Sequence, residues 1–279
     1  MYTNLIQLFN KYRGKTGIGA FNLHCMEMLP YMIKGAKKAD SPIIIQTSQG
    51  TAEYVGLEWL VNSVKLYSEL YDMDICLHLD HCKDIDFIKC AIDKGYTSVM
   101  YDGSNLPIEE NIENTKKVIA YAHSKNVSVE GEIGNIGGSE DGVVSKDNIG
   151  SYTRLEDAIR FTNETKVDAL AIAIGTVHGQ YRSKANINYD LLDSIVDNIS
   201  DIGLVLHGGT GVSNTDFKKC AEKGMMKFNV GTELNKGYID EITGSLSTAT
   251  PTTSLRKLFS PANEKIENIV FERCNLLKI

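Results

Sequence analysis

Eight short apolar segments, each followed by an amphipathic segment, constrain the fold of this chain more than any other feature. The apolar segments are near-continuous, which indicates strands buried on both faces, as in a parallel sheet. They lie at 18–23, 43–48, 75–80, 97–102, 127–133, 169–175, 203–207 and 227–231. The amphipathic segments lie at 26–39, 53–71, 84–94, 109–125, 155–165, 189–199, 213–223 and 233–246. Strands that alternate with helices in this way predict an α/β fold.

Eight strand–helix pairs are the number required for a (β/α)8 barrel, the TIM barrel. The alternative is an open doubly wound sheet, which binds its ligands at one switch point. Reactive side chains follow five of the predicted strands, and a barrel gathers such strand ends at one rim. We therefore expect a single (β/α)8 barrel domain over 1–279, preceded by an N-terminal helix. The tail at 251–279 is expected to form a C-terminal helical extension that packs on the barrel or on a second subunit.

Composition narrows the class of protein. The 279 residues are 42% hydrophobic, which is ample for one large core. The formal net charge is −7 and no run of Lys and Arg exceeds two residues, so a nucleic-acid or anionic-membrane partner is disfavoured. No apolar run approaches the roughly 20 residues that span a bilayer, and segment 1–14 lacks the features of a signal peptide. Six scattered cysteines without a CxxC pair indicate a reducing compartment, so we expect a cytoplasmic protein.

Three of the predicted strands end in a histidine: His81 follows CLHLD, His178 follows AIAIGTV, and His207 follows GLVL. In one parallel barrel these three imidazoles converge at the same rim. Three imidazoles with an open fourth position are typical of a catalytic zinc site. Cys82 is an alternative fourth ligand. The remaining histidines are expected to be ordinary hydrogen-bonded residues: His24, His78 and His123.

Carboxylates also gather at strand ends. Asp80 precedes His81, Asp102 ends the fourth strand, and Glu130 and Glu132 share one face of the fifth strand by their spacing of two. Around three histidines, Asp80, Asp102 and Glu132 indicate a metal site with an outer carboxylate layer or an alternative cation position. Strict alternation would send Asp80 and His81 to opposite faces, so we expect the strand to bend or end there.

Two glycine-rich turns follow the last two predicted strands. HGGTG at 207–211 and NVGT at 229–232 each precede a helix. In (β/α)8 barrels, backbone amides at these positions often bind phosphate, and Asn229 and Thr232 add side-chain donors. The longest predicted loop, 134–154, is rich in glycine, and we expect a mobile lid there.

Taken together, these residues resemble the class II, metal-dependent ketose-bisphosphate aldolases, which include fructose-bisphosphate and tagatose-bisphosphate aldolases. The resemblance runs from about residue 3 to residue 275. It is carried by AFNLH at 20–24, QTSQG at 46–50, HLDH at 78–81, SVMYDGS at 98–104, EGEIGNIGGSEDG at 130–142, AIAIGTVHGQY at 171–181, VLHGGTG at 205–211 and KFNVGTEL at 227–234.

The resemblance implies a role for each matching residue. His81, His178 and His207 would bind zinc, and Asp102 and Glu132 would hold a second or displaced metal position. Asp80 would transfer the proton at the C4 oxygen, and Glu140 would help to move the proton at C3. The substrate-binding residues implied are Asn22, Ser48, Gly179, Gly208, Gly209, Thr210, Asn229, Gly231, Thr232 and Arg256. Backbone carbonyls around Val177 and Gly179 would hold a monovalent cation, Na⁺ or K⁺.

The implied activity is that of a zinc-dependent class II fructose-1,6-bisphosphate aldolase of glycolysis and gluconeogenesis. Such an enzyme reversibly cleaves the ketose bisphosphate to dihydroxyacetone phosphate and glyceraldehyde 3-phosphate. The motifs leave the C4 stereochemistry open. Gly231 stands where members specific for fructose bisphosphate often have Asp, and DGS and AIAIGT are closer to tagatose-bisphosphate aldolases, whereas HGGTG is closer to the fructose type. The resemblance also implies a homodimer, in which Arg256 reaches the partner's distal phosphate.

The sequence is less consistent with three other functions. A Schiff-base aldolase needs a lysine near the C-terminal ends of the strands, and Lys227 opens the eighth strand, at the opposite rim. A barrel metallohydrolase usually has an HxH pair on its first strand, which AFNLHCM at 20–26 lacks. A non-catalytic sugar-phosphate-binding protein does not need Asp80 and Glu140, and both are present.

Overall fold

The computed structural model of the chain describes residues 1–279 except 135, 137–138, 141–142, 145–150, 178 and 180–184. Eight parallel strands form a closed barrel in the order β1-β10-β9-β8-β5-β4-β3-β2. Their bounds are β1 Ile18–Asn22, β2 Ile43–Thr47, β3 Ile75–Cys82, β4 Ser98–Tyr101, β5 Ser128–Ile133, β8 Ala169–Ile172, β9 Gly203–Leu206 and β10 Met225–Val230. The predicted (β/α)8 barrel is confirmed, and the open-sheet alternative is excluded because β1 pairs with β10.

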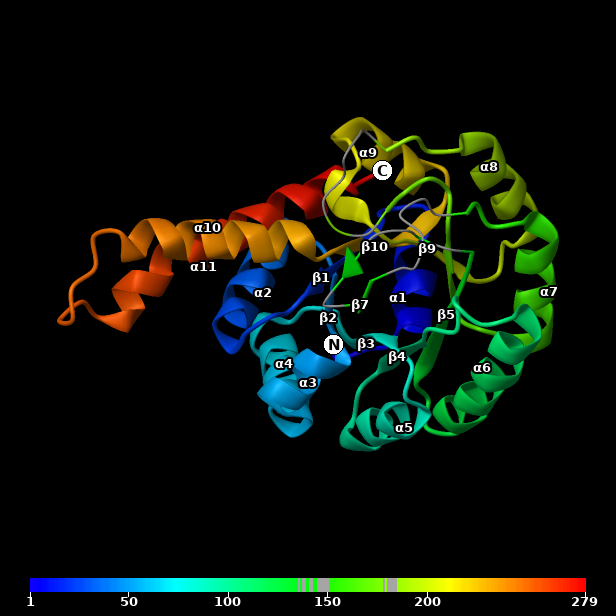
Figure 1. Cartoon of the computed structure of the whole chain (residues 1–279), viewed down its shortest axis with the longest axis horizontal. Helices are drawn as coiled ribbons and strands as arrows, with labels where there is room; N and C mark the ends of the chain where they lie inside the picture. Colours follow the sequence, from blue (N-terminus) through cyan, green and yellow to red (C-terminus); the bar gives the residue numbers. More distant parts are fainter. Residues whose placement is uncertain (135, 137–138, 141–142, 145–150, 178, 180–184) are drawn as a thin grey trace.

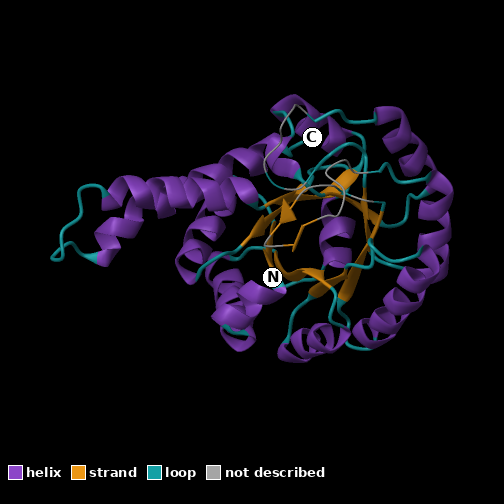
Figure 2. Ribbon diagram, in the orientation of Figure 1, coloured by secondary structure: helices purple, strands orange, loops and turns teal. Residues whose placement is uncertain are grey.

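Helices form a ring outside the barrel (Figure 1, Figure 2). Their bounds are α2 Leu29–Lys38, α3 Gln49–Val55, α4 Leu57–Tyr71, α5 Ile85–Lys94, α6 Ile108–His123, α7 Leu155–Thr165, α8 Tyr189–Asn198 and α9 Asn214–Glu222. A short two-stranded sheet, β6 Ser139–Glu140 and β7 Val143–Val144, lies within the predicted lid loop. The segments predicted to be amphipathic therefore form the helices that cover the outer face of the barrel.

Local capping residues set where these helices begin and end. The Asp84 side chain accepts hydrogen bonds from the amides of Asp86 and Phe87, at 2.9 and 3.1 Å, and so caps the start of α5. The same helix ends at Gly95, whose φ of 112° is favoured by glycine. The helix predicted over 53–71 is instead two helices, α3 and α4, because Gly56 lies between them with φ of 95°.

The helix of the predicted C-terminal extension forms an arm together with the helix that precedes it. Helices α10 Thr232–Leu246 and α11 Leu255–Leu276 lie side by side, and their outer ends project well beyond the barrel (Figure 1). The inner part of α11 packs against α2 and β1. Among the helices in the described part of the chain, none has the length and apolar character needed to cross a membrane.

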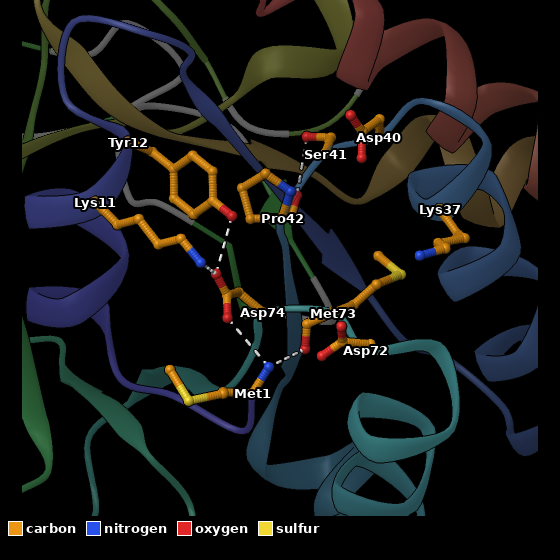
Figure 3. A pocket seen from close by; sticks show the side chains of 10 residues that line it. All are labelled: Met1, Lys11, Tyr12, Lys37, Asp40, Ser41, Pro42, Asp72, Met73 and Asp74. Carbon is orange, nitrogen blue, oxygen red and sulfur yellow. Dashed lines mark hydrogen bonds and ion pairs between the residues drawn. The ribbon is translucent and has the colours of Figure 1, made fainter.

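The N-terminal end of the barrel is closed by α1, Leu5–Tyr12. Leu5, Leu8 and Phe9 are at most 2% exposed and join an apolar cluster with inward-facing strand residues, including Ile18. Asp74, just before β3, pairs with Lys11 and accepts a hydrogen bond from the Tyr12 hydroxyl at 2.9 Å (Figure 3). The N-terminal end of the barrel, which we call the floor, is therefore filled with apolar side chains of α1 and stabilised at its edge by the Asp74–Lys11 ion pair. A ligand must enter from the opposite end, which we call the mouth.

Candidate active site

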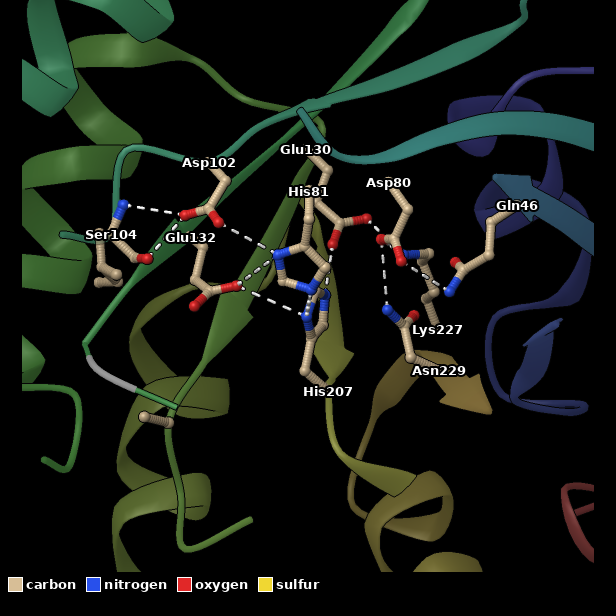
Figure 4. A network of polar contacts seen from close by, with 12 residues as sticks. Gln46, Asp80, His81, Asp102, Ser104, Glu130, Glu132, His207, Lys227 and Asn229 are labelled. Atoms are coloured by element: carbon tan, nitrogen blue, oxygen red, sulfur yellow. Dashed lines mark hydrogen bonds and ion pairs between the residues drawn. The ribbon is translucent and has the colours of Figure 1, made fainter. Parts of the chain in front are cut away.

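A β-bulge at the end of β3 brings two neighbouring side chains to the barrel mouth. From Leu79 to Cys82 the strand advances three residues while its partner β4 advances two. Within this bulge His81 has φ of 48°, an uncommon conformation for a residue with a Cβ. The extra residue breaks the alternation, so Asp80 and His81 both face the cluster at the mouth (Figure 4). The predicted bend is confirmed.

Two imidazoles meet at this mouth. His207 follows β9 and is fully buried, and its Nδ1 lies 2.9 Å from Nε2 of His81. The rings are nearly perpendicular, with centroids 4.6 Å apart. Each ring presents its other nitrogen to a carboxylate: His81 Nδ1 lies 3.2 Å from Asp102 Oδ2, and His207 Nε2 lies 2.8 Å from Glu130 Oε1. Carboxylates in this position orient metal-ligating histidines in proteins.

Two further carboxylate contacts complete the cluster. The amide and hydroxyl of Ser104 donate to Asp102 Oδ1, at 3.1 and 2.6 Å, and hold that carboxylate in place. Glu132 Oε2 is buried and accepts no hydrogen bond from the residues that the structure describes. It lies 3.5 Å from His207 Nδ1 and 3.9 Å from His81 Nδ1. A buried carboxylate oxygen with no donor is strongly disfavoured unless a proton or a cation compensates it.

The electrostatics of the cluster fit a divalent cation. Ligand atoms of Asp80, His81 and His207 lie within 4.8 Å of one another, as do those of His81, Asp102 and Glu132. Burial, reinforced by the Asp102 charge, raises the pKa of Glu132 well above its ordinary value. Burial alone would lower the pKa of His81, but the charge of Asp80 and the hydrogen bond to Asp102 outweigh it and raise that pKa well above its ordinary value. The cluster thus attracts positive charge, which a metal ion supplies.

Asp80 is held by amide side chains from neighbouring strands. Gln46 Nε2 on β2 donates to Asp80 Oδ2 at 3.0 Å and also lies 2.7 Å from Asn22 Oδ1 on β1. Asn229 Nδ2 on β10 approaches Asp80 Oδ1 at 3.4 Å. The predicted residues Asp80 and Asn229 therefore share one row with Gln46 (Figure 4), and Gln46 connects this row to the predicted residue Asn22. Donors on both oxygens favour the ionised carboxylate.

The first glycine-rich turn packs closely against its two neighbouring strand ends. A Cβ on Gly208, which has φ of 67°, would lie 2.3 Å from the carbonyl oxygen of Val177. A Cβ on Gly209 would lie 2.5 Å from the carbonyl oxygen of Asn229. These positions require glycine because the three loops approach one another through their backbones.

The second glycine-rich turn lies beside the first. Gly231 and Thr232 form the start of α10, and the amide of Glu233 in its first turn donates to Thr210 Oγ1 at 3.2 Å. The turn after β9 and the N-terminus of α10 are therefore joined directly. Backbone amides at such positions suit an anion such as phosphate.

Comparison with known proteins agrees with this geometry. The sequence profile of the family described as "Fructose-bisphosphate aldolase class-II" matches residues 3–279. The chain is 37% identical to a sulfofructosephosphate aldolase from Alkalicoccus urumqiensis, over 84% of this chain and 81% of that protein. It is 36% identical to a fructose-bisphosphate aldolase from Geobacillus stearothermophilus, over 92% and 90%. The crystal structure of the YdjI aldolase from Escherichia coli K12 superposes with a TM-score of 0.85 at 26% identity, over 99% and 97%.

The chain belongs to the class II fructose-bisphosphate aldolase family. The predicted family and the predicted enzyme class, an aldolase and therefore a lyase, are confirmed. The family is metal-dependent, and the residues at the mouth of this aldolase fit a metal. The non-catalytic alternative loses its support, since the relatives compared above are named aldolases.

The expectation that Lys227 stays at the opposite rim was wrong. Lys227 does lie near the start of β10, but its amine does not stay at the opposite rim. The side chain is fully buried inside the barrel, with Nζ 2.8 Å from Glu130 Oε2 and 3.9 Å from Asp80 Oδ1 (Figure 4). The long side chain points inward, like that of Asn229 two residues on, and extends toward the mouth. Its ion pair with Glu130 occupies the amine that a Schiff-base enzyme would need free.

The structure places the other predicted residues less centrally or leaves them out. His178 lies outside the described residues, as does the side chain of Glu140, whose backbone forms β6. Ser48 caps α3 by accepting from the amide of Thr51, and Gly179 has φ of 81° beside the mouth loops. Arg256 is the second residue of α11, at the outer end of the arm, and is not brought to this chain's own site (Figure 1).

The Cys82 alternative is not supported. Its Sγ lies 3.5 Å from Asp84 O and 3.5 Å from Gln49 Oε1, and the side chain belongs to the apolar layer outside the barrel. Burial raises the pKa of its thiol to about 12.

Three buried polar residues were missed or set aside by the sequence reasoning: Gln46, Glu130 and Lys227. Each is a polar residue inside an otherwise apolar strand, and each sits two positions from a predicted site residue or strand end. That spacing was the available signal, because period-two neighbours share a face. His78, predicted to be structural, lies 2.7 Å from Ser98 Oγ through Nδ1. Burial and then the charge of Lys227 lower its pKa well below its ordinary value, which keeps it neutral.

Proposed function

We propose that this class II aldolase reversibly cleaves fructose 1,6-bisphosphate to dihydroxyacetone phosphate and glyceraldehyde 3-phosphate, as a cytoplasmic glycolytic and gluconeogenic homodimer. The observation that carries the proposal is the position of Asp80. It lies beside the converging nitrogens of His81 and His207, held by amide donors on both oxygens. This arrangement joins an acid–base group to a metal site within a single cluster.

His81, His207 and His178 would hold the metal, which we propose to be zinc. A zinc ion bound there supplies a Lewis acid that polarises the ketone of the substrate. Asp102 and Glu132 would hold a second or displaced divalent cation. Carbonyl groups around Val177 and Gly179 would hold a monovalent cation, Na⁺ or K⁺.

Asp80 would carry the proton at C4. As the C3–C4 bond breaks, the carboxylate accepts the proton of the C4 hydroxyl, and the O–H electron pair forms the aldehyde carbonyl. The electron pair of the C3–C4 bond remains with the ketone half. In condensation Asp80 returns the same proton. Glu140, in the lid loop, would move the proton at C3 of the ketone half, and the closed lid would exclude water.

The glycine-rich turns would bind phosphate. Gly209 lies against Asn229 at the end of β10, and Thr210 lies against the start of α10, where Gly231 and Thr232 present backbone amides. Gly208 would belong to the same site. Ser48, Gly179 and Asn229 would add to this site, and Asn22 would contact the ketone half. Anchoring the phosphates positions the C3–C4 bond next to Asp80.

Arg256 would bind the distal phosphate of the partner subunit. It lies on the outer part of the arm, so it serves a site only if a second chain receives that arm. Exposed apolar residues occur along the same arm: Ile239, Leu246 and Leu255. Size determination of the purified protein by light scattering tests this, and a monomer at working concentration contradicts it.

Tagatose 1,6-bisphosphate is the second candidate substrate, favoured by Gly231 in place of the aspartate common in fructose-type members. The deciding experiment compares kcat/KM for fructose and tagatose 1,6-bisphosphates on the same preparation. We expect the fructose substrate to be preferred. A preference for tagatose 1,6-bisphosphate overturns the assignment within the family, and tight binding without cleavage of either overturns the proposed activity.

A further inference from the structure

We propose that Lys227 is a positioning residue for the metal site, which it serves by holding Glu130 as the acceptor that fixes the ring of His207. The inference rests on the proposed function, since it concerns how the aldolase prepares His207 to bind metal. Within the described part of the chain, Lys227 Nζ lies 2.8 Å from Glu130 Oε2 and 3.9 Å from Asp80 Oδ1. Of these two contacts, only the shorter one, with Glu130, leads on to His207.

The three groups form one continuous line inside the barrel (Figure 4). Lys227 Nζ lies 2.8 Å from Glu130 Oε2, and Glu130 Oε1 lies 2.8 Å from His207 Nε2. All three side chains are 0% exposed. They come from β10, β5 and the end of β9, so only the closed barrel brings them together.

The contact between Glu130 and His207 determines which nitrogen of His207 is available to a metal. A carboxylate only accepts hydrogen bonds, so the ring must donate to Glu130 from Nε2. In a neutral imidazole the other nitrogen then carries the free electron pair. That nitrogen, Nδ1, is the one 2.9 Å from Nε2 of His81. Lys227 Nζ, 2.8 Å from the other carboxylate oxygen, holds Glu130 in this orientation.

Stability alone does not account for this buried pair. The interiors of (β/α)8 barrels are usually filled with branched apolar side chains. Replacing a buried ion pair with uncharged groups is often neutral or stabilising, whereas removing one partner is strongly destabilising. Neighbouring interior positions do carry apolar side chains, such as Val205, which is opposite Lys227 in the β9–β10 register. The charged pair is therefore better explained by what it does to His207.

The test compares Lys227→Met, Glu130→Gln and the double variant, with Val205→Ala as the control. Two quantities are measured on metal-stripped full-length protein: its thermal midpoint, and its zinc affinity by competition with a chromogenic chelator. A third is the tautomer of His207, read from long-range ¹H–¹⁵N NMR correlations of the zinc-free protein.

We expect Lys227→Met to lose both stability and zinc affinity, since it leaves Glu130 buried without its cation. The double variant should regain stability but still bind zinc about 10- to 100-fold more weakly, the usual effect of losing a partner of a ligating histidine. Its His207 should populate both tautomers, because an amide can donate or accept. Val205→Ala should lower the thermal midpoint and leave zinc affinity unchanged.

A purely structural role for the pair predicts a different result: the double variant would recover stability and zinc affinity together. Zinc affinity within about threefold of the natural protein, or a single Nε2–H tautomer in the double variant, overturns the proposal. Failure of the proposed function has its own signature, since the natural protein would then neither bind zinc nor cleave a ketose bisphosphate.

Discussion

The two ends of the barrel shift the pKa of a buried carboxyl group in opposite directions. At the floor, burial would raise the pKa of Asp74, but hydrogen bonds from Lys11 and other donors outweigh it and lower that pKa. At the mouth, burial and a neighbouring carboxylate raise the pKa of Glu132. The carboxylate of Asp74 pairs with cations of the chain itself, whereas Glu132 Oε2 receives no hydrogen bond from any described residue. The same scaffold is thus closed at one end for stability and left short of positive charge at the other, where a metal can bind.

Asp80→Asn should give the largest functional effect at the mouth. An amide cannot accept the C4 proton, so we expect kcat to fall by about two to four orders of magnitude. Zinc content, measured by inductively coupled plasma mass spectrometry, should stay that of the natural protein because the imidazoles are intact. Loss of zinc with only a small loss of rate would exchange the roles given to Asp80 and the histidines.

His207→Ala tests the metal half of the mouth. It removes one converging nitrogen and leaves Glu130 without the imidazole that donates to it. We expect zinc affinity to fall more than about 100-fold, beyond the effect of losing only an outer partner. Chelator competition measures it, and His123→Ala, a surface change on α6, is the matched control. Unchanged zinc affinity in His207→Ala would remove this residue from the site.

Leu8→Ala tests the floor. Leu8 is 1% exposed in the apolar cluster between α1 and the inward-facing strand residues, so its truncation leaves a cavity in the barrel interior. We expect a loss of about 2–5 kcal/mol in the free energy of unfolding, with zinc affinity and kcat unchanged at a temperature where the protein stays folded. A comparable loss of kcat would show that the two ends are not independent.

Asp74→Asn should give the smallest effect, and a pH-dependent one. The folded pKa of Asp74 is below its ordinary value, so its ion pairs stabilise the fold fully above an unfolded pKa near 3.8. This contribution is lost as pH falls through the folded pKa. Because Lys11 is largely exposed, we expect about 1 kcal/mol at pH 7. Urea unfolding of both proteins should converge at low pH, and a difference that grows on acidification contradicts the assignment.

The barrel and the histidine-bearing strand ends could be predicted because they depend on local pattern. Eight apolar runs locate the strands, and the residue after each run locates the rim. The Asp80–His81 bend was also foreseeable, since two adjacent functional side chains cannot share one face of a regular strand.

The contacts of Lys227 and Glu130 inside the barrel could not be predicted in the same way. Whether Lys227 reaches Glu130 depends on the register of β10 against its neighbours and on the direction in which the side chain extends, and neither is visible in one strand's sequence. The break between α3 and α4 is local, because Gly56 has φ of 95°. The arm of α10 and α11 depends instead on how these two helices pack on each other beyond the barrel, which the sequence of one helix does not reveal.

The most direct test is the rate of fructose 1,6-bisphosphate cleavage by protein stripped of metal and then titrated with zinc. The account predicts that the stripped protein loses nearly all activity, and that about one zinc ion per chain restores it. Full-rate cleavage by the metal-free protein would contradict the central claim, because Asp80 would then be working without the cation that His81 and His207 are proposed to hold.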